Sequence, residues 1–209
     1  STQAKTLFPY TTLFRSTITA IVDSGLFQGT RFSSILWHND KEISGEKDED
    51  DDGNFCTDDF YGCDLLRRRG FPIDDLEIKE RYHHGTHVAG IASGCLIKGD
   101  LGDELAKRIQ LMILKVIDQN GVVNPSAVAD AILYAQEKNA RIMNMSLDYY
   151  ESPHIRADLK RLEERMLVVA AAGNESRSSV SYPARHDHVI AVGAVLAMVC
   201  CQSVSLVCQ

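Results

Sequence analysis

The chain has 209 residues, of which 44% are hydrophobic and 24% are charged, and its formal net charge is −7. This size and composition suit one globular domain with a sizeable core. An acidic chain lacks the clustered lysines and arginines that bind phosphate backbones, so no nucleic-acid partner is expected. The only basic run, Arg67-Arg68-Arg69, is surrounded by acidic residues.

The first 16 residues are set apart from the rest of the chain. Thr6 to Ser16 reads TLFPYTTLFRS, which resembles the conceptual translation of a sequencing adapter. The segment also lacks the basic start and apolar core of a signal peptide. We therefore interpret residues 1–16 as an artefact and expect the folded domain to span residues 17–195.

Five short apolar runs predict buried β-strands. They are Thr17–Asp23, Ile109–Asp118, Arg141–Leu147, Met166–Ala172 and Val189–Val195. Runs that are apolar at nearly every position suit strands covered on both faces, and such strands favour a parallel sheet.

Helical patterns lie between these runs. Asn124 followed by Pro125 is typical of a helix N-terminus. In two segments the apolar residues then recur on one helical face: Val128, Ala131, Ile132 and Ala135, and later Ile155, Leu159 and Leu162. The alternation predicts an α/β fold, a doubly wound and mostly parallel sheet with helices on both faces. Function in such folds gathers at the carboxyl ends of the strands.

The C-terminal tail differs in composition from the domain before it. After Val195 the sequence reads LAMVCCQSVSLVCQ, with three of the six cysteines and no charged residue. We interpret residues 196–209 as an out-of-frame or aberrant tail, the alternative being a genuine hydrophobic tail. Polar residues interrupt Val189–Cys208, so no membrane span is expected there.

The cysteines leave the redox compartment open. They form no CxxC pair and no zinc-ligand spacing. Cys56 and Cys63 are spaced to bridge a loop in an exported protein, whereas free thiols suit a reducing compartment. The cellular location is therefore not predicted.

Three polar segments carry side chains suited to catalysis. Asp23 ends the first strand in AIVDSG, His84 opens a helix of small residues in YHHGTHVAG, and Asn174 follows a strand in VVAAAGNE. Each has an ordinary alternative, such as a strand-ending acid or a Gly-Asn turn. A zinc site at His83 and His87, one helical turn apart, would need the glutamate of HExxH at position 84, where a histidine stands.

Together these segments resemble the subtilisin-like serine proteases (subtilases) from about Thr17 to Val195. Their Asp-Ser-Gly, His-Gly-Thr-His-Val-Ala-Gly and Ala-Ala-Gly-Asn motifs occur in the family's order. The resemblance implies that His84 is a general base, that Asp23 orients its ring, and that Asn174 donates to an oxyanion. It implies a monomeric serine endopeptidase that acts on polypeptides and needs no cofactor for its chemistry.

The family's Gly-Thr-Ser-Met-Ala segment, which carries the nucleophile, does not occur in this sequence. Ser203 and Ser205 lack the preceding glycine and the following helix, so neither is assigned that role. The fold is therefore expected to be incomplete at its C-terminus and the chain to be inactive. The alternative is a non-catalytic pseudoprotease or calcium-binding module, while a nucleotide-binding domain would need a GxGxxG segment.

Smaller matches imply substrate contacts. Asn144–Leu147 resembles the strand that lines the family's P1 pocket, and Asp148 stands where the family has glycine, which suggests a basic P1 residue. Gly121–Val123 resembles the edge that pairs with the substrate backbone. The expected substrate-binding residues are Gly121, Val122, Ser146, Leu147 and Asp148.

The acidic loop Asp48–Asp59 reads DEDDDGNFCTDD. Carboxylates at loop positions 1, 3, 5 and 12, with glycine at position 6, have the spacing that hard cations prefer. The sequence predicts a structural Ca²⁺ site at Asp48, Asp50, Asp52 and Asp59, although a solvated acidic loop would show the same pattern.

Overall fold

The computed structural model describes residues 16–27, 34–75, 83–94, 104–149, 151, 153–174 and 179–194. The predicted tail at 196–209 and, except for Ser16, the predicted artefact at 1–16 lie outside the described residues. Ser203 and Ser205 lie outside them as well.

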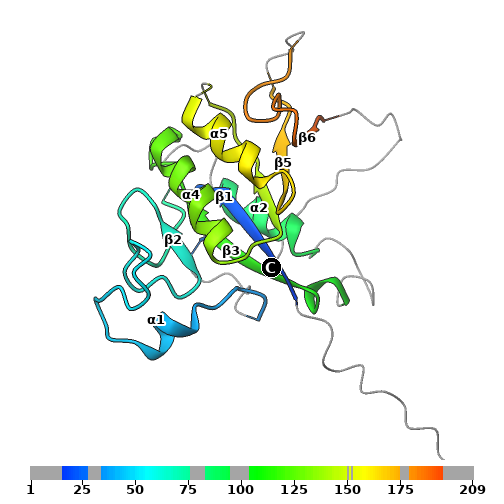
Figure 1. Ribbon diagram of the computed structural model, residues 1–209. Coiled ribbons are helices and arrows are strands. Elements are labelled where there is room, and N and C mark those ends of the chain that lie inside the picture. The colour runs from blue at the N-terminus through cyan, green and yellow to red at the C-terminus, as the bar shows by residue number, and fades with distance from the viewer. Residues whose placement is uncertain are drawn as a thin grey trace, which may run out of the picture.

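Six parallel strands form one sheet in the order β2-β3-β1-β4-β5-β6 (Figure 1). Five of them coincide with the predicted runs: β1 (Thr17–Asp23), β3 (Ile109–Lys115), β4 (Ile142–Met145), β5 (Leu167–Ala171) and β6 (Val189–Val192). The sixth, β2 (Gly62–Asp64), was not predicted, because three residues are too few to show an apolar period.

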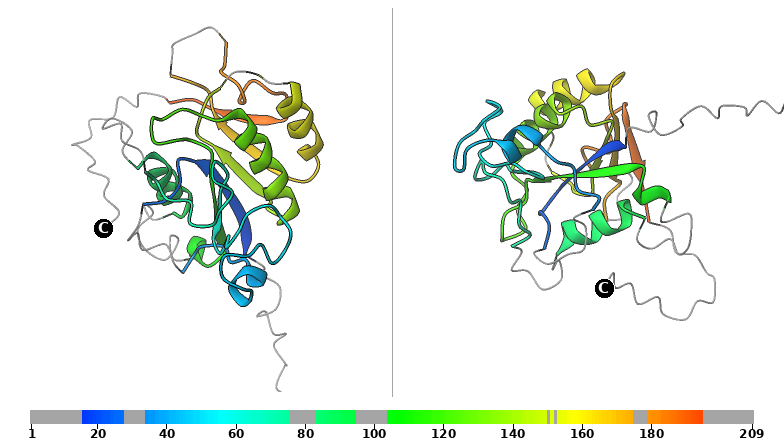
Figure 2. Two further views of the ribbon diagram at one scale, coloured as in Figure 1. Left: turned by 90° about the vertical axis from the view of Figure 1, so that its left-hand side faces the viewer. Right: turned by 90° about the horizontal axis from the view of Figure 1, so that it is seen from below.

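Helices cover both faces of the sheet. α4 (Pro125–Glu137) and α5 (Pro153–Leu162) lie on one face and α2 (His84–Ala92) on the other, as Figure 2 shows from below. The side chain of Asn124 accepts hydrogen bonds from the first N–H groups of α4, as its position before Pro125 predicted. The short helix α1 (Asp40–Ser44) precedes the acidic loop. The doubly wound α/β prediction is confirmed.

The core has two sides because successive residues of a strand point to opposite faces. Ala20 and Val22 of β1 pack into the large cluster under α4 and α5. Ile21, between them, packs with Ala89 of α2 in the smaller cluster. Each fully buried large aliphatic side chain contributes about 1.5–3 kcal/mol. The alternation therefore fixes which side chains of the strand face each layer of helices.

The topology places a switch point of the strand order at the carboxyl end of β1. This strand lies between β3 and β4, so the chain continues to one side of it and later to the other. In open α/β sheets such a reversal of strand order is where ligands bind. Asp23, the last residue of β1, is at this point.

The β6 edge differs from the prediction of strands covered on both faces. Leu167 of β5 and Ile190 of β6 are each 48% exposed, and Val192 is 54% exposed. Within the described ranges, no helix packs over these three side chains. The apolar run predicted a covered strand, but the described part of the chain does not supply the covering layer. None of the helices in those ranges has both the length and the apolarity needed to cross a bilayer.

Candidate active site

A glycine turn holds the carboxylate of Asp23 at the end of β1. Asp23 is 1% exposed, and its Oδ1 accepts a hydrogen bond from the N–H of Ser24 at 2.8 Å. Gly25 has a φ of +108°, and a Cβ there would lie 2.5 Å from the carbonyl oxygen of Pro72. Glycine thus lets the segment around Pro72 pair with Leu26, whose N–H donates to that carbonyl.

The first turn of α2 is seated directly on this glycine turn. The N–H of Gly85 donates to Ser24 Oγ at 2.9 Å. A Cβ on Gly85 would lie 2.3 Å from the carbonyl oxygen of Gly25, so a larger residue would push the helix away. Gly85, Ala89 and Gly90 are buried, and their small size lets this helix approach the sheet closely.

This seating places His84 against Asp23. The distance from His84 Nδ1 to Asp23 Oδ1 is 2.8 Å, and the imidazole side chain is 41% exposed while the carboxylate is buried. When Nδ1 donates its proton to a carboxylate, the neutral ring presents Nε2 as the proton acceptor. The pair therefore has the geometry of a general base oriented by a buried acid.

Asn174 lies at the same edge of the sheet. It follows β5, whose carboxyl end points the same way as that of β1 because all strands are parallel. Gly173 has a φ of +101°, which turns the chain at this point, and Asn174 is exposed. The structure thus places Asn174 at the carboxyl edge of the sheet, the edge that also carries Asp23.

The predicted substrate segments also begin at strand ends. Ser146, Leu147 and Asp148 follow β4 directly; Ser146 Oγ accepts a hydrogen bond from Asn144 at 2.9 Å, and Asp148 is exposed. Gly121 lies further along the chain after β3, inside a turn in which Asp118 accepts the N–H of Val122. Val122 is 60% exposed and available at the surface.

The acidic loop forms a carboxylate cluster that differs in part from the predicted set. Within the described part of the chain, ligand atoms of Glu42, Asp52 and Asp59 lie within 4.8 Å of one another. Asp50 instead accepts the N–H groups of residues 53–55, and Asp48 pairs with Arg69. Glu42 was missed because it comes from α1, outside the spacing pattern of the loop.

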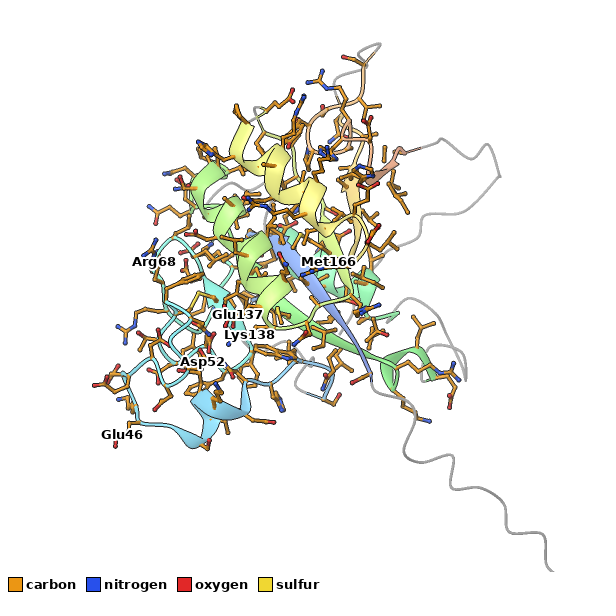
Figure 3. The ribbon with its side chains drawn as sticks, viewed as in Figure 1. Glu46, Asp52, Arg68, Glu137, Lys138 and Met166 are labelled. Carbon is orange, nitrogen blue, oxygen red and sulfur yellow. A yellow bond between two sulfur atoms is a disulfide. The ribbon has the colours of Figure 1, made fainter. Side chains whose placement is uncertain are left out.

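Donors from three elements surround this cluster. Asp59 accepts hydrogen bonds from Asn39, Asn54 and the Tyr134 hydroxyl, and burial, only partly offset by these bonds, raises the pKa of Asp59 to about 6. Asp52 pairs with Lys138 at the end of α4 (Figure 3). Burial opposes ionisation of Asp52, but the bonds from Lys138 and Asn39 outweigh it and lower its pKa. Asp52 Oδ1 is buried with no hydrogen-bond partner among the described residues.

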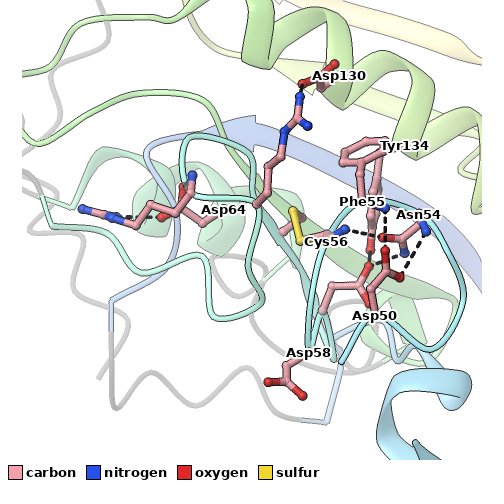
Figure 4. The surroundings of a disulfide bond; sticks show 12 residues. Asp50, Asn54, Phe55, Cys56, Asp58, Asp64, Asp130 and Tyr134 are labelled. Carbon is pink, nitrogen blue, oxygen red and sulfur yellow. Dashed lines mark hydrogen bonds and ion pairs between the residues drawn. A yellow bond between two sulfur atoms is a disulfide. The ribbon is translucent and has the colours of Figure 1, made fainter. Parts of the chain in front are cut away.

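A disulfide ties the cluster to the sheet. Cys56 and Cys63 are bonded to each other and fully buried, which joins the loop carrying Asp59 to β2 (Figure 4). The N–H of Cys56 donates to Asn54 Oδ1, so the bond is continuous with the network around Asp59. The sequence left this pairing open, and the structure places the two sulfurs together.

A buried aspartate and a half-buried histidine paired at the switch point of a doubly wound parallel sheet define an α/β protein with a candidate acid–base pair. The family model described as "Subtilase family" matches residues 15–203. The chain belongs to the subtilase family, and the resemblance seen in its motifs is confirmed.

Individual relatives agree. The chain is 34% identical to the thermophilic serine proteinase of Bacillus sp. (strain AK1) over 133 residues, 63% of this chain and 33% of that protein. It is 34% identical to the halolysin-like extracellular serine protease Nep of Natrialba magadii over 137 residues, 65% of this chain and 25% of that protein. The chain thus spans a third or less of these relatives.

A solved structure supports the fold. The psychrophilic subtilisin-like protease Apa1 from the Antarctic psychrotroph Pseudoalteromonas sp. AS-11 matches with a TM-score of 0.54 and 22% identity, over 84% of this chain and 35% of that chain. At this identity the match concerns the arrangement of strands and helices.

Proposed function

We propose that this chain is the aspartate–histidine part of a serine-type endopeptidase that hydrolyses peptide bonds. The observation that carries the proposal is the 2.8 Å pairing of His84 Nδ1 with the buried Asp23 at the switch point of the sheet. Membership of the subtilase family supports it.

In the proposed reaction His84 Nε2 removes the proton of a serine hydroxyl as its oxygen attacks the substrate carbonyl carbon. Asp23 stabilises the resulting imidazolium, which then gives the proton to the leaving amine. Water, activated by the same nitrogen, hydrolyses the acyl-enzyme. The Asn174 amide would donate to the oxyanion, a contribution of about 10²–10³ in rate, a value that comes from subtilisin itself.

The Gly-Thr-Ser segment that carries the family's nucleophile does not occur in these 209 residues, so we propose that this chain alone does not turn over. The test compares this chain with the same chain continued in its own gene through a Gly-Thr-Ser segment, using a fluorogenic peptide mixture. Only the continued chain is expected to hydrolyse it. Hydrolysis by the 209-residue chain that disappears in His84→Ala would contradict this, and a gene without such a segment would favour a non-catalytic pseudoprotease.

Asp148 is proposed to favour a basic P1 residue. It is exposed directly after the segment that resembles the wall of the P1 pocket, and a carboxylate there would attract a lysine or arginine side chain. In the complete enzyme we expect kcat/KM to be higher after lysine than after phenylalanine. Asp148→Gly should remove the difference, since it restores the family's residue. Equal cleavage after the two residues by the unmodified enzyme would sink the idea.

We also propose a structural calcium ion held by Glu42, Asp52 and Asp59. The three carboxylates converge, and the orphaned Asp52 Oδ1 offers a buried oxygen for a hard cation. A bound ion would neutralise the cluster and cross-link α1 with the loop before β2. It would take no part in the peptide-bond chemistry.

Calcium is expected to raise the free energy of unfolding by about 2.7 kcal/mol at one hundred times its dissociation constant. Thermal unfolding in chelator and in calcium measures this, with Asp52→Asn expected to lose most of the gain. Asp48→Asn is the matched control, because Asp48 lies in the same loop but pairs with Arg69 outside the cluster. An unfolding temperature that ignores calcium in the unmodified chain would refute the ion.

Export to an oxidising compartment is proposed as well. The buried Cys56–Cys63 bond suits such a compartment, and the name of the relative Nep describes that protein as extracellular. Mass spectrometry of the protein isolated from its source would show the bond intact if the proposal holds.

A further inference from the structure

A fully buried lysine lies beside the aspartate–histidine pair. Lys115, the last residue of β3, is 0% exposed. Residues 111–114 before it and Val116 and Ile117 after it are all buried and apolar, so its ammonium is taken out of water in a hydrophobic strand. Removing an ammonium from water is costly unless its hydrogen bonds are replaced, and a methionine of similar length would avoid that cost.

The sheet register shows what the lysine is beside. Lys115 pairs with Asp23 on one side and with Asp64 on the other. Residues paired in register on neighbouring strands point to the same face of the sheet. The row Asp64–Lys115–Asp23 therefore places one cation between two carboxylate positions at the carboxyl edge of the sheet.

Among the residues that the structure describes, the ammonium has two partners. Lys115 Nζ donates to the carbonyl oxygen of Ser24 at 2.7 Å and to Asp75 Oδ1 at 2.7 Å. Asp75 has a second cation, because Arg67 lies 3.1 Å from its other oxygen. Neutralising Asp75 therefore does not require Lys115, whereas the Ser24 carbonyl receives its side-chain hydrogen bond from this lysine.

Ser24 is the link between Asp23 and His84. Its N–H donates to the Asp23 carboxylate and its hydroxyl accepts the N–H of Gly85, the residue after His84. With the bond from Lys115, each polar group of Ser24 has a partner: the N–H bonds to β1, the hydroxyl to α2 and the carbonyl to β3. Release of its carbonyl would free the Ser24–Gly25 peptide plane to rotate, which would loosen the turn on which the other two bonds depend.

We propose that Lys115 is a positioning residue for the aspartate–histidine pair, acting through the carbonyl of Ser24. The inference rests on the proposed function because it takes this pair to carry out the acid–base chemistry. The lysine itself touches neither ring nor carboxylate in the proposed reaction. It fixes the turn that keeps the proton of His84 on Nδ1 and leaves Nε2 as the acceptor.

The test reads the tautomer of His84 in the 209-residue chain by ¹⁵N NMR of the imidazole, which needs no turnover. The unmodified chain is expected to hold the neutral ring with its proton on Nδ1. Lys115→Met should shift the ring several-fold toward the Nε2–H form that predominates in free histidine. Arg67→Met is the matched control: it removes the other cation from Asp75 without touching Ser24, and the tautomer should not change.

An unchanged tautomer in a folded Lys115→Met chain would overturn the proposal, as would an equal shift in Arg67→Met. If Lys115→Met does not fold, the test uses the unmodified chain. The NMR coupling between Lys115 Nζ and the Ser24 carbonyl carbon across their hydrogen bond is then measured, and the absence of this coupling would overturn the proposal. Failure of the proposed peptidase function would appear in the activity assay and leave the tautomer unaltered, so the two failures are distinguishable.

Discussion

In the enzyme completed by its serine-bearing segment, replacing His84 with alanine is expected to lower kcat by about 10⁶-fold, a magnitude measured in subtilisin itself. The physical reason is that His84 is the ring paired with Asp23, at 2.8 Å, and its Nε2 is the atom that would accept the serine proton. Steady-state hydrolysis of a fluorogenic peptide measures the loss. The rates are divided by the enzyme concentration, which is calibrated by active-site titration of the unmodified protein.

Two further variants make that result specific. His87→Ala removes the exposed histidine one turn further along α2 and is expected to change kcat by no more than a few-fold. Asp23→Asn keeps the size of the side chain but lets the ring adopt the wrong tautomer, and it should cost about 10⁴-fold. Equal losses for His84→Ala and His87→Ala would show that the helix, and not the paired ring, limits activity.

The elements that the sequence predicted are those whose signal is local. Each predicted run of seven to ten residues produced a strand, and Asn124 before Pro125 produced the start of α4. The three-residue β2 has no local signal, and its place beside β3 depends on the register with Ile113. The burial of β6 was overestimated. An apolar run indicates that a strand needs a covering layer, but it does not indicate which element provides that layer.

The sequence predicted only those site residues that lie in recognisable motifs. Asp23 and His84 are 61 positions apart, and their pairing was expected from the family resemblance, since no spacing rule joins a strand end to a helix start. No motif joins the buried cations to their partners. Lys115 meets Asp75 across 40 positions and Lys138 meets Asp52 across 86, so only the folded chain shows these pairs.

The pair of Asp52 with Lys138 leads to the second large effect. Asp52 is 2% exposed and Lys138 is 11% exposed, counting side chains, so neither charge is solvated. Removing one partner of a buried ion pair leaves the other charge uncompensated and costs about 3–5 kcal/mol. We expect Lys138→Met to lower the free energy of unfolding by that amount in chelator, as urea denaturation would measure.

The same variant separates a cation site from an ordinary ion pair. In the unmodified chain a calcium ion at Asp52 must share this carboxylate with the ammonium of Lys138, whereas in Lys138→Met the ion would be the only cation there. Calcium should therefore recover most of the lost stability in the variant and stabilise it more than the unmodified chain. Lys107→Met is the matched control, since its pair with Glu104 is exposed on both sides and solvent screening leaves such a pair little effect on stability. A loss in Lys138→Met that calcium does not reduce would show that the cluster is built around the lysine alone.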